Sequence, residues 1–161
     1  GITGLVNAVY NRGRGTTIVL DNGTTAMTGH QGHPGTGTSA RGEASPRVII
    51  EDLVRGIGVR DVSIVNAFDL TLVEDTIRRC VETEEPSVII VRGDCPLHVR
   101  GKGRPLTVDL DQCDQCFNCL RVGCQAITRE GGEIRIDAGL CVGDRCAVCS
   151  QVCHRKAIRV K

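Results

Sequence analysis

The amino-acid sequence predicts an α/β fold: the later part of a doubly wound parallel sheet, followed by a small α+β domain rich in cysteine. Helix-like and strand-like apolar patterns alternate over residues 1–92, as they do in parallel sheets covered by helices. Eight of the ten cysteines then fall between Cys113 and Cys153, and the first 79 residues contain none. We therefore expect one domain over residues 1–92, a Gly-, Pro- and Arg-containing linker over 93–105, and a second domain over 106–161.

Three helices are expected in the first domain, and each has a local start or stop signal. Ser45 and Pro46 can begin the second helix and Gly58 can end it, while Asp69 can cap the third helix and Pro86 can stop it. Their apolar faces recur at helical spacing: Ile2, Leu5, Val6 and Val9; Ile50, Leu53, Val54 and Ile57; Val73, Ile77 and Cys80 or Val81.

Buried parallel strands are expected between these helices, at residues 16–20, 62–65 and 88–91. The resulting order is αβαβαβ. A doubly wound unit normally begins with a strand that leads into its first helix. We therefore expect the first strand of this domain to lie before residue 1.

Composition excludes several classes of function. The chain has 161 residues, 40% hydrophobic and 24% charged, with a net charge of +1, so it can bury a core and has no strongly basic surface for nucleic acid. One Tyr, two Phe and no Trp leave few stacking platforms for single strands. No apolar run is long enough to span a bilayer, and no secretory signal is visible. We therefore expect a cytoplasmic location, with neither a membrane nor nucleic acid as a partner.

The cysteines form two runs within an internal duplication of about 28 residues. Matching apolar frames precede each run, and an Ala-Ile pair follows each last cysteine. Closely spaced thiolates hold three corners of a 4Fe-4S cluster, while the fourth ligand comes from the other run. The expected sets are Cys113, Cys116, Cys119 and Cys153 for the first cluster, and Cys141, Cys146, Cys149 and Cys124 for the second.

Residues 106–161 resemble the two-cluster bacterial-type ferredoxins. Gln125 and His154 stand where those proteins usually have proline, and the loops 120–123 and 142–145 are longer than usual. These departures affect the amide hydrogen bonds to sulfur, and hence the reduction potentials, but remove no ligand. The alternative is two structural zinc sites of four cysteines each, although zinc ribbons pair two CxxC knuckles and need no third nearby cysteine.

A polar loop follows the first predicted strand, where open α/β sheets bind ligands. It opens with Asp21 and Asn22 and continues as GTTAMTGHQGHPG. The amide oxygen of Asn22 and the main-chain carbonyl of Thr24 are hard donors that suit a Mg²⁺ ion holding a diphosphate. The loop is no Walker A motif, because no Gly-Lys-Ser/Thr follows.

This stretch resembles the thiamine diphosphate enzymes, whose motif ends in such an asparagine. The chain is similar to the C-terminal part of the large (alpha) subunit of the indolepyruvate ferredoxin oxidoreductase family. The similarity lies in the segment LDNGTTAMTGHQGHPGTG, in GITGLVNAVYN before it and in the cysteine-rich unit after it. The resemblance implies that Asn22 and Thr24 bind Mg²⁺ and that Asp21 orients the turn. It also implies that Gly29, His30 and Gln31 lie near the diphosphate or the substrate, and that the glutamate activating thiamine lies elsewhere, so no catalytic residue is named.

The same resemblance implies oxidative decarboxylation of aryl pyruvates such as indolepyruvate to acyl-CoA. The cofactors would be thiamine diphosphate, Mg²⁺ and two 4Fe-4S clusters. Partners would be the 2-oxo acid, coenzyme A, an external ferredoxin, the remaining domains of the large subunit and a smaller subunit. The alternative is a stand-alone two-cluster electron carrier, but such carriers are usually acidic, and residues 106–161 have eight Lys/Arg against seven Asp/Glu.

Three further residues have a plain structural interpretation. We expect His33 to be part of the loop structure and Cys80 to be a small core residue on a helix face. Cys95, which precedes Pro96, is expected to be a free thiol, and neither cysteine is expected to have a partner.

Overall fold

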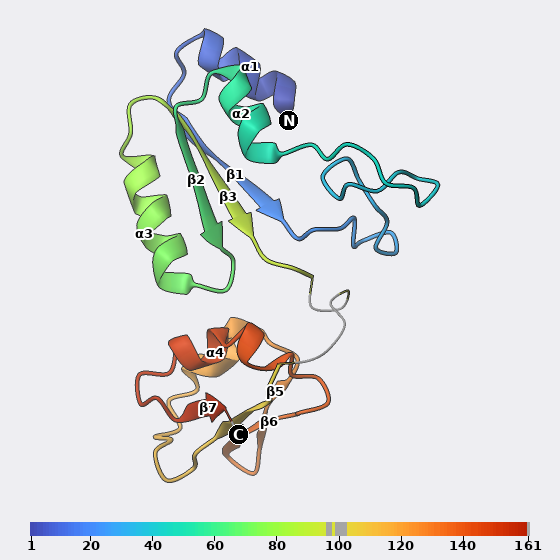
Figure 1. The fold of residues 1–161 in the computed structure, drawn as a ribbon. Helices are drawn as coiled ribbons and strands as arrows, with labels where there is room; N and C mark the ends of the chain where they lie inside the picture. Colours follow the sequence, from blue (N-terminus) through green and yellow to red (C-terminus); the bar gives the residue numbers. More distant parts are fainter. Residues whose placement is uncertain (96–97, 99–102, 161) are drawn as a thin grey trace. The chain divides into compact units, whose positions relative to one another are not determined.

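The chain folds into two compact units, residues 1–98 and 99–161 (Figure 1). The computed structural model describes residues 1–95, 98 and 103–160. The boundary falls inside the stretch 93–105 that the composition marks as a linker. At one end of this stretch Gly93 and Cys95 hydrogen-bond within the first unit, and at the other Gly103 and Arg104 hydrogen-bond within the second.

The first unit has the alternating αβαβαβ order that the sequence predicts. Its sheet is parallel throughout, in the order β1-β3-β2, with Asp21 and Asn66 both beside Arg92 in the register. The elements are α1 (Ile2–Tyr10), β1 (Gly15–Asp21), α2 (Ile50–Ile57), β2 (Asp61–Asn66), α3 (Leu70–Val81) and β3 (Pro86–Arg92).

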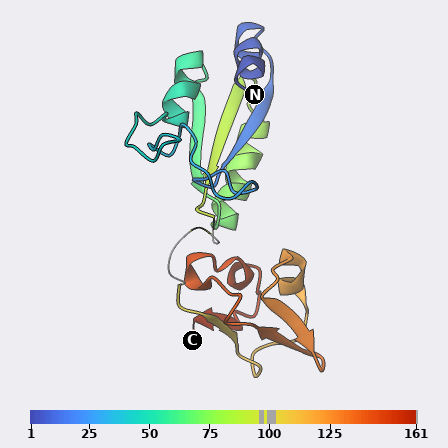
Figure 2. The same cartoon turned by 90° about the vertical axis from the view of Figure 1, so that its right-hand side faces the viewer.

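The central strand β3 is buried on both faces, which explains its continuous apolar sequence. Because successive side chains point to opposite faces, Val88 and Ile90 pack in one cluster with Val54 of α2, whereas Ile89 and Val91 pack in another with Cys80 of α3. The helices α1 and α2 therefore cover one face of the sheet and α3 covers the other (Figure 1, Figure 2).

The edge strand β1 is less well covered than β3, so the strand predicted at residues 16–20 is present but its predicted burial is wrong. Ile18 and Leu20 lie on the same face as α3 but remain 45% and 79% exposed, because α3 packs mainly over β2 and β3. Ile2 and Val6 of α1 are also about half exposed, whereas Leu5 and Val9 pack against the core. The apolar face predicted for this helix is thus only partly buried within this unit.

Helix boundaries confirm two sequence signals and correct two others. Gly58 ends α2 as expected, as its C-cap with a φ of 107°. The Asp69 carboxylate accepts a hydrogen bond from the Leu72 amide at 3.0 Å and caps α3 as expected. The start predicted at Ser45 and Pro46 is wrong, because Ser45 and Val48 hydrogen-bond to the preceding loop and hold this segment outside a helix until residue 50. Pro86 does not end α3 directly but is the first residue of β3, where proline is tolerated.

The second unit consists of two small antiparallel sheets and short helical turns. Sheet pairing joins β4 with β7 and β5 with β6. The elements are β4 (Leu106–Val108), the 3-10 turn η1 (Asn118–Val122), β5 (Ile127–Glu130), β6 (Glu133–Ile136), the 3-10 turn η2 (Gly143–Arg145), α4 (Val148–Gln151) and β7 (Ile158–Val160).

The sequence duplication has a counterpart in the hydrogen bonds of this unit. The Asp109 amide of the first copy donates to the Ala157 carbonyl of the second, and the Asp137 amide of the second donates to the Ala126 carbonyl of the first, both at 2.8 Å. Each copy therefore binds the C-terminal end of the other copy through a backbone hydrogen bond. This exchange brings the last cysteine of each copy toward the cysteine loop of its counterpart.

The core of the second unit is small and includes cysteines. Leu106, Ile127, Ile134 and Ile158 come from all four strands and are buried together with Cys119, Cys141 and Cys149. Across the part of the chain that the structure describes, no helix has the length and apolar character needed to cross a membrane.

Candidate functional site

The carboxyl ends of β1 and β3 hold a cluster of charged side chains. Arg92, the last residue of β3, donates from Nε to Asp21 Oδ2 at 2.9 Å and from a terminal nitrogen to Glu51 Oε2 of α2 at 3.0 Å. The other Asp21 oxygen accepts the Gly23 amide at 3.1 Å. Arg92 thus ties the first residue of the polar loop to a neighbouring strand and a helix.

Electrostatics keep both carboxylates of this cluster ionised. Burial by itself raises the pKa of Asp21, but the hydrogen bonds from Arg92 and Gly23 outweigh it and lower the pKa below its ordinary value. The hydrogen bond from Arg92 likewise lowers the pKa of Glu51. The sequence analysis missed Arg92 and Glu51. A parallel register that places the end of β3 beside Asp21 could have pointed to Arg92, but nothing in the sequence pairs either residue with Glu51.

Asn22 and Thr24 form the tight turn that follows Asp21. The Asn22 side-chain oxygen accepts the Thr24 amide at 3.2 Å, and the Asn22 carbonyl accepts the Cys95 amide at 3.2 Å. Thr24 is buried, and its hydroxyl donates to the Gln31 carbonyl at 3.3 Å. Both predicted magnesium donors are hard oxygens on one fixed turn beyond a strand end, and this donor chemistry fits Mg²⁺.

The loop that follows closes on itself between Thr25 and Gln31, whose backbones exchange hydrogen bonds of 3.0 and 3.2 Å. The Gln31 side chain also bonds locally: its oxygen accepts the Thr28 hydroxyl at 2.6 Å and its amide donates to the Thr28 carbonyl. Gly29 and His30 occupy the bend with positive φ values of 110° and 60°. The Gln31 side chain therefore shapes the loop rather than extending from it.

The histidines of this loop have different surroundings. His30 Nε2 lies 3.7 Å from Cys95 Sγ, and its ring stacks on that of His98 with centroids 5.3 Å apart. Cys95 is a free thiol as expected, but the expectation that it has no partner is wrong, because the chain after β3 runs beside the loop after β1. His33 Nδ1 accepts the Gly35 amide at 3.1 Å, which is a structural role. Cys80 is 1% exposed in the core as expected, but it also has a partner, because its Sγ lies 3.8 Å from Asp61 Oδ2.

In the second unit, the first predicted set of cysteines surrounds a cavity. The cavity contains about 350 Å³ of empty space, part of it open to solvent. The Ala157 amide donates to Cys153 Sγ at 3.3 Å. Burial raises the pKa of Cys119, and the charges of the three other thiols of the set raise it further. The cavity lining includes Cys113, Cys116, Cys119 and Cys153.

The second set of cysteines gathers around Cys149. Burial, together with the neighbouring thiols, raises the pKa of Cys149 to about 11; those thiols are Cys141, Cys146 and Cys124. The Gly143 amide donates to Cys141 Sγ at 3.3 Å. Bound iron would stabilise the thiolate form of these cysteines, and backbone amides already donate to two of the eight sulfurs. This donor set fits iron–sulfur clusters.

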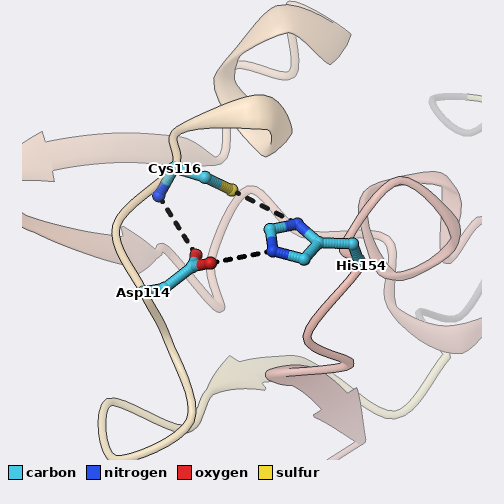
Figure 3. Close-up of side chains that lie close together, drawn as sticks. All are labelled: Asp114, Cys116 and His154. Carbon is cyan, nitrogen blue, oxygen red and sulfur yellow. Dashed lines mark hydrogen bonds and ion pairs between the residues drawn. The ribbon is translucent and has the colours of Figure 1, made fainter.

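A polar triad lies at the edge of the first cysteine set (Figure 3). His154 Nε2 is 2.8 Å from Asp114 Oδ2, and His154 Nδ1 is 3.7 Å from Cys116 Sγ. The second Asp114 oxygen accepts the Cys116 amide at 3.3 Å. His154 therefore connects the residue after Cys153 with the loop that holds Cys116.

Residues 2–91 match the family model of the thiamine pyrophosphate (thiamine diphosphate) enzymes, C-terminal TPP binding domain. The chain belongs to this family. It is also 43% identical over 161 residues to the indolepyruvate oxidoreductase subunit IorA of Methanothermobacter marburgensis and 41% identical over 165 residues to that of Archaeoglobus fulgidus, each alignment covering 99% of this chain. The corresponding subunit of Pyrococcus horikoshii is 36% identical over 163 residues, covering 95% of the chain.

These matches confirm the resemblance on which the sequence analysis relied. The chain spans about a quarter of the length of the curated relatives: 26% of the first two and 25% of the third. The family match lies on the first unit, so the turn at Asp21, Asn22 and Thr24 belongs to a thiamine diphosphate-binding domain. The second unit lies outside that match but inside the alignments with the three relatives.

Proposed function

We propose that this chain is the cofactor-binding and electron-transfer part of a 2-oxoacid:ferredoxin oxidoreductase that acts on aryl pyruvates such as indolepyruvate. In the overall reaction a 2-oxo acid and coenzyme A give acyl-CoA, CO₂, one proton and two electrons. Bound thiamine diphosphate supplies the carbanion chemistry that releases CO₂, and 4Fe-4S clusters accept the electrons singly for an external ferredoxin.

In this proposal the first unit holds the diphosphate through Mg²⁺. Asn22 Oδ1 and the Thr24 carbonyl supply two oxygen ligands, and Asp21 fixes the turn because Arg92 and Gly23 hold its carboxylate. His30, whose ring contacts the Cys95 thiol, is proposed to lie near the diphosphate or the substrate, together with Gly29 and Gln31. The match of residues 2–91 to a thiamine pyrophosphate domain argues against a stand-alone electron carrier.

The second unit is proposed to be a ferredoxin-like domain with two 4Fe-4S clusters. The observation that carries this part is the grouping of eight thiols into two sets of four, each made of three cysteines from one copy and the last cysteine of the other. Two structural zinc ions are the alternative. The third closely spaced cysteine of each run favours iron–sulfur clusters, because zinc ribbons pair two CxxC knuckles and need no such residue.

The remaining domains of the large subunit and a smaller subunit are proposed as further partners. The relatives are about four times as long as this chain, since it covers 26% of them. Ile18 and Leu20 of the edge strand β1 present apolar surface that a further part of the enzyme would cover. We also propose a cytoplasmic location, because eight cysteines clustered after a cysteine-free segment favour metal or cluster chemistry in a reducing compartment over a disulfide framework.

Anaerobic purification with counting of iron and sulfide tests the cluster assignment. We expect a brown protein with two 4Fe-4S clusters, whose visible absorption falls on reduction. A colourless preparation that contains zinc would contradict the assignment.

Cysteine variants then test how the two sets are composed. Cys153→Ala should damage the cluster of Cys113, Cys116 and Cys119, and the matched variant Cys124→Ala should damage the other, as counted by electron paramagnetic resonance of the reduced enzyme. Release of CO₂ should outlast ferredoxin reduction in both. If Cys153→Ala instead destroys the cluster next to Cys149, the exchanged ligation is wrong.

A further inference from the structure

The ring of His154 lies between a carboxylate and a sulfur, and this placement assigns it a hydrogen-bonding role. Nε2 faces Asp114 Oδ2 at 2.8 Å, and Nδ1 faces Cys116 Sγ at 3.7 Å (Figure 3). Asp114 also accepts the backbone amide of Cys116, so the same carboxylate orients both the ring and the cysteine. Histidine and aspartate each directly follow a cysteine of the first set.

The direction of the hydrogen bond to sulfur follows from the chemistry of that atom. A metal-bound thiolate only accepts hydrogen bonds, so Nδ1 is the donor to Cys116 Sγ, while the contact of Nε2 with Asp114 Oδ2 fixes the orientation of the ring. Metal ligands commonly have such outer partners, which set the electron density on the ligand atom.

We propose that His154, positioned by Asp114, donates a hydrogen bond to the Cys116 sulfur and raises the reduction potential of the first cluster. The inference rests on the proposed iron–sulfur function. A donor at a ligand sulfur stabilises the reduced cluster more than the oxidised one, because reduction adds negative charge that the sulfur shares. His154 is a positioning and tuning residue, and the cluster keeps four cysteine ligands.

The internal duplication supplies a comparison within the same molecule. Gln125 occupies the position after Cys124 that His154 occupies after Cys153, and Val142 occupies the position after Cys141 that Asp114 occupies after Cys113. The second set therefore has neither the imidazole nor the acid. The two clusters should differ in potential through this pair, and only the first should respond to its removal.

Redox titration of the intact enzyme, followed by electron paramagnetic resonance, tests the inference. His154→Phe keeps a ring but has no donor, and it should shift the reduction equilibrium of the first cluster about tenfold toward the oxidised form, which is about 59 mV for one electron. The second cluster should not move. The matched variant Gln125→Leu should lower neither potential, and Cys153→Ala identifies which signal belongs to the first cluster.

A conservative variant separates the hydrogen bond from a structural effect. The amide nitrogen of His154→Asn can occupy the place of Nδ1, so this variant should have a potential closer to the parent than His154→Phe does. Asp114→Asn also removes a charge. Its positioning role is therefore measured as a difference: the effect of His154→Phe should be smaller in the Asp114→Asn background than in the parent.

Failure of the inference is distinguishable from failure of the proposed function. Two intact clusters with unchanged potentials in His154→Phe would overturn the role of His154 but leave the clusters in place. Strong coupling of nitrogen-15 from labelled histidine to the reduced first cluster would also overturn it, because His154 would then be an iron ligand. A parent enzyme without iron and sulfide would refute the proposed function itself.

Discussion

Replacement of Arg92 by methionine tests the charged cluster that holds the turn of the thiamine diphosphate-binding domain. Methionine keeps an unbranched apolar stem but removes the guanidinium that contacts Asp21 at 2.9 Å and Glu51 at 3.0 Å. Two carboxylates with side-chain exposures of only 10% and 17% would then lie near each other without a counter-charge. We expect lower stability and weaker binding of Mg²⁺ and thiamine diphosphate.

The magnitude follows from the burial of the three groups. Breaking a fully buried ion pair costs about 3–5 kcal/mol, because one charge is left uncompensated. The Arg92 side chain is 35% exposed, so solvent screens part of this interaction. We therefore expect a loss of about 2 kcal/mol in the free energy of unfolding near neutral pH.

The pH dependence gives the prediction a sign. Arg92 lowers the pKa values of Asp21 and Glu51 from their ordinary values of 3.8 and 4.5, so its stabilising effect is present above these values and is lost as the pH falls through the lowered pKa values. The difference between parent and Arg92→Met should be largest near pH 7 and should narrow below about pH 4.

Urea unfolding followed by far-UV circular dichroism at both pH values measures this difference, and amide hydrogen exchange of β1 and β3 assigns it to the first unit. Arg78→Met is the matched control. Arg78 pairs with Glu74 at 2.6 Å on the exposed surface of α3, so its loss should have little effect. Equal penalties for the two variants, or a penalty for Arg92→Met that does not change with pH, would refute the reasoning.

Two further predictions concern single turns. Asn22→Ala should raise the concentrations of Mg²⁺ and thiamine diphosphate needed for half-saturation at least tenfold, with no loss of iron. The control Asn66→Ala removes a similar 3.0 Å turn contact after β2 and should leave both concentrations unchanged. Equal affinities in the two variants would count against Asn22. Gly143→Ala should destabilise the second unit by at least about 2 kcal/mol, because Gly143 has a φ of +81° and a Cβ there would overlap the Gly103 backbone. The control Gly123→Ala has a similar φ but open space around the Cβ, so it should destabilise the unit less. Thermal unfolding compares the two variants.

Local patterns were sufficient to predict most of the secondary structure. The strands expected at residues 16–20, 62–65 and 88–91 lie within β1, β2 and β3, because apolar and β-branched runs favour strands. Their predicted burial is correct only for β3, since no residue of β1 and one residue of β2 are buried. Asp69 was identified as a cap because capping depends on residues three apart. The start of the second helix was mispredicted, because Ser45 bonds to the Gly37 carbonyl, a loop contact that no local signal reveals.

The chemistry of the two candidate sites was also readable from the sequence, because ligand type and spacing are local properties. The cysteine spacing predicted two sets of four thiols, and the residues after β1 predicted hard oxygen donors for Mg²⁺. The assignment of residues 2–91 to a thiamine pyrophosphate enzyme domain supports thiamine diphosphate as the cofactor of the first unit. Both ligand assignments remain predictions, and the iron, sulfide and Mg²⁺ measurements proposed above would test them.

Tertiary structure decided the contacts that join distant parts of the chain. Arg92 meets Asp21 only because β3 inserts beside β1, and Glu51 joins them only because α2 packs over that face. Cys95 meets His30 because the segments after the same two strands run together. His154 meets Asp114 and Cys116 because each copy of the duplication holds the end of the other. Such pairs have no fixed spacing in sequence, so only the folded chain brings them together.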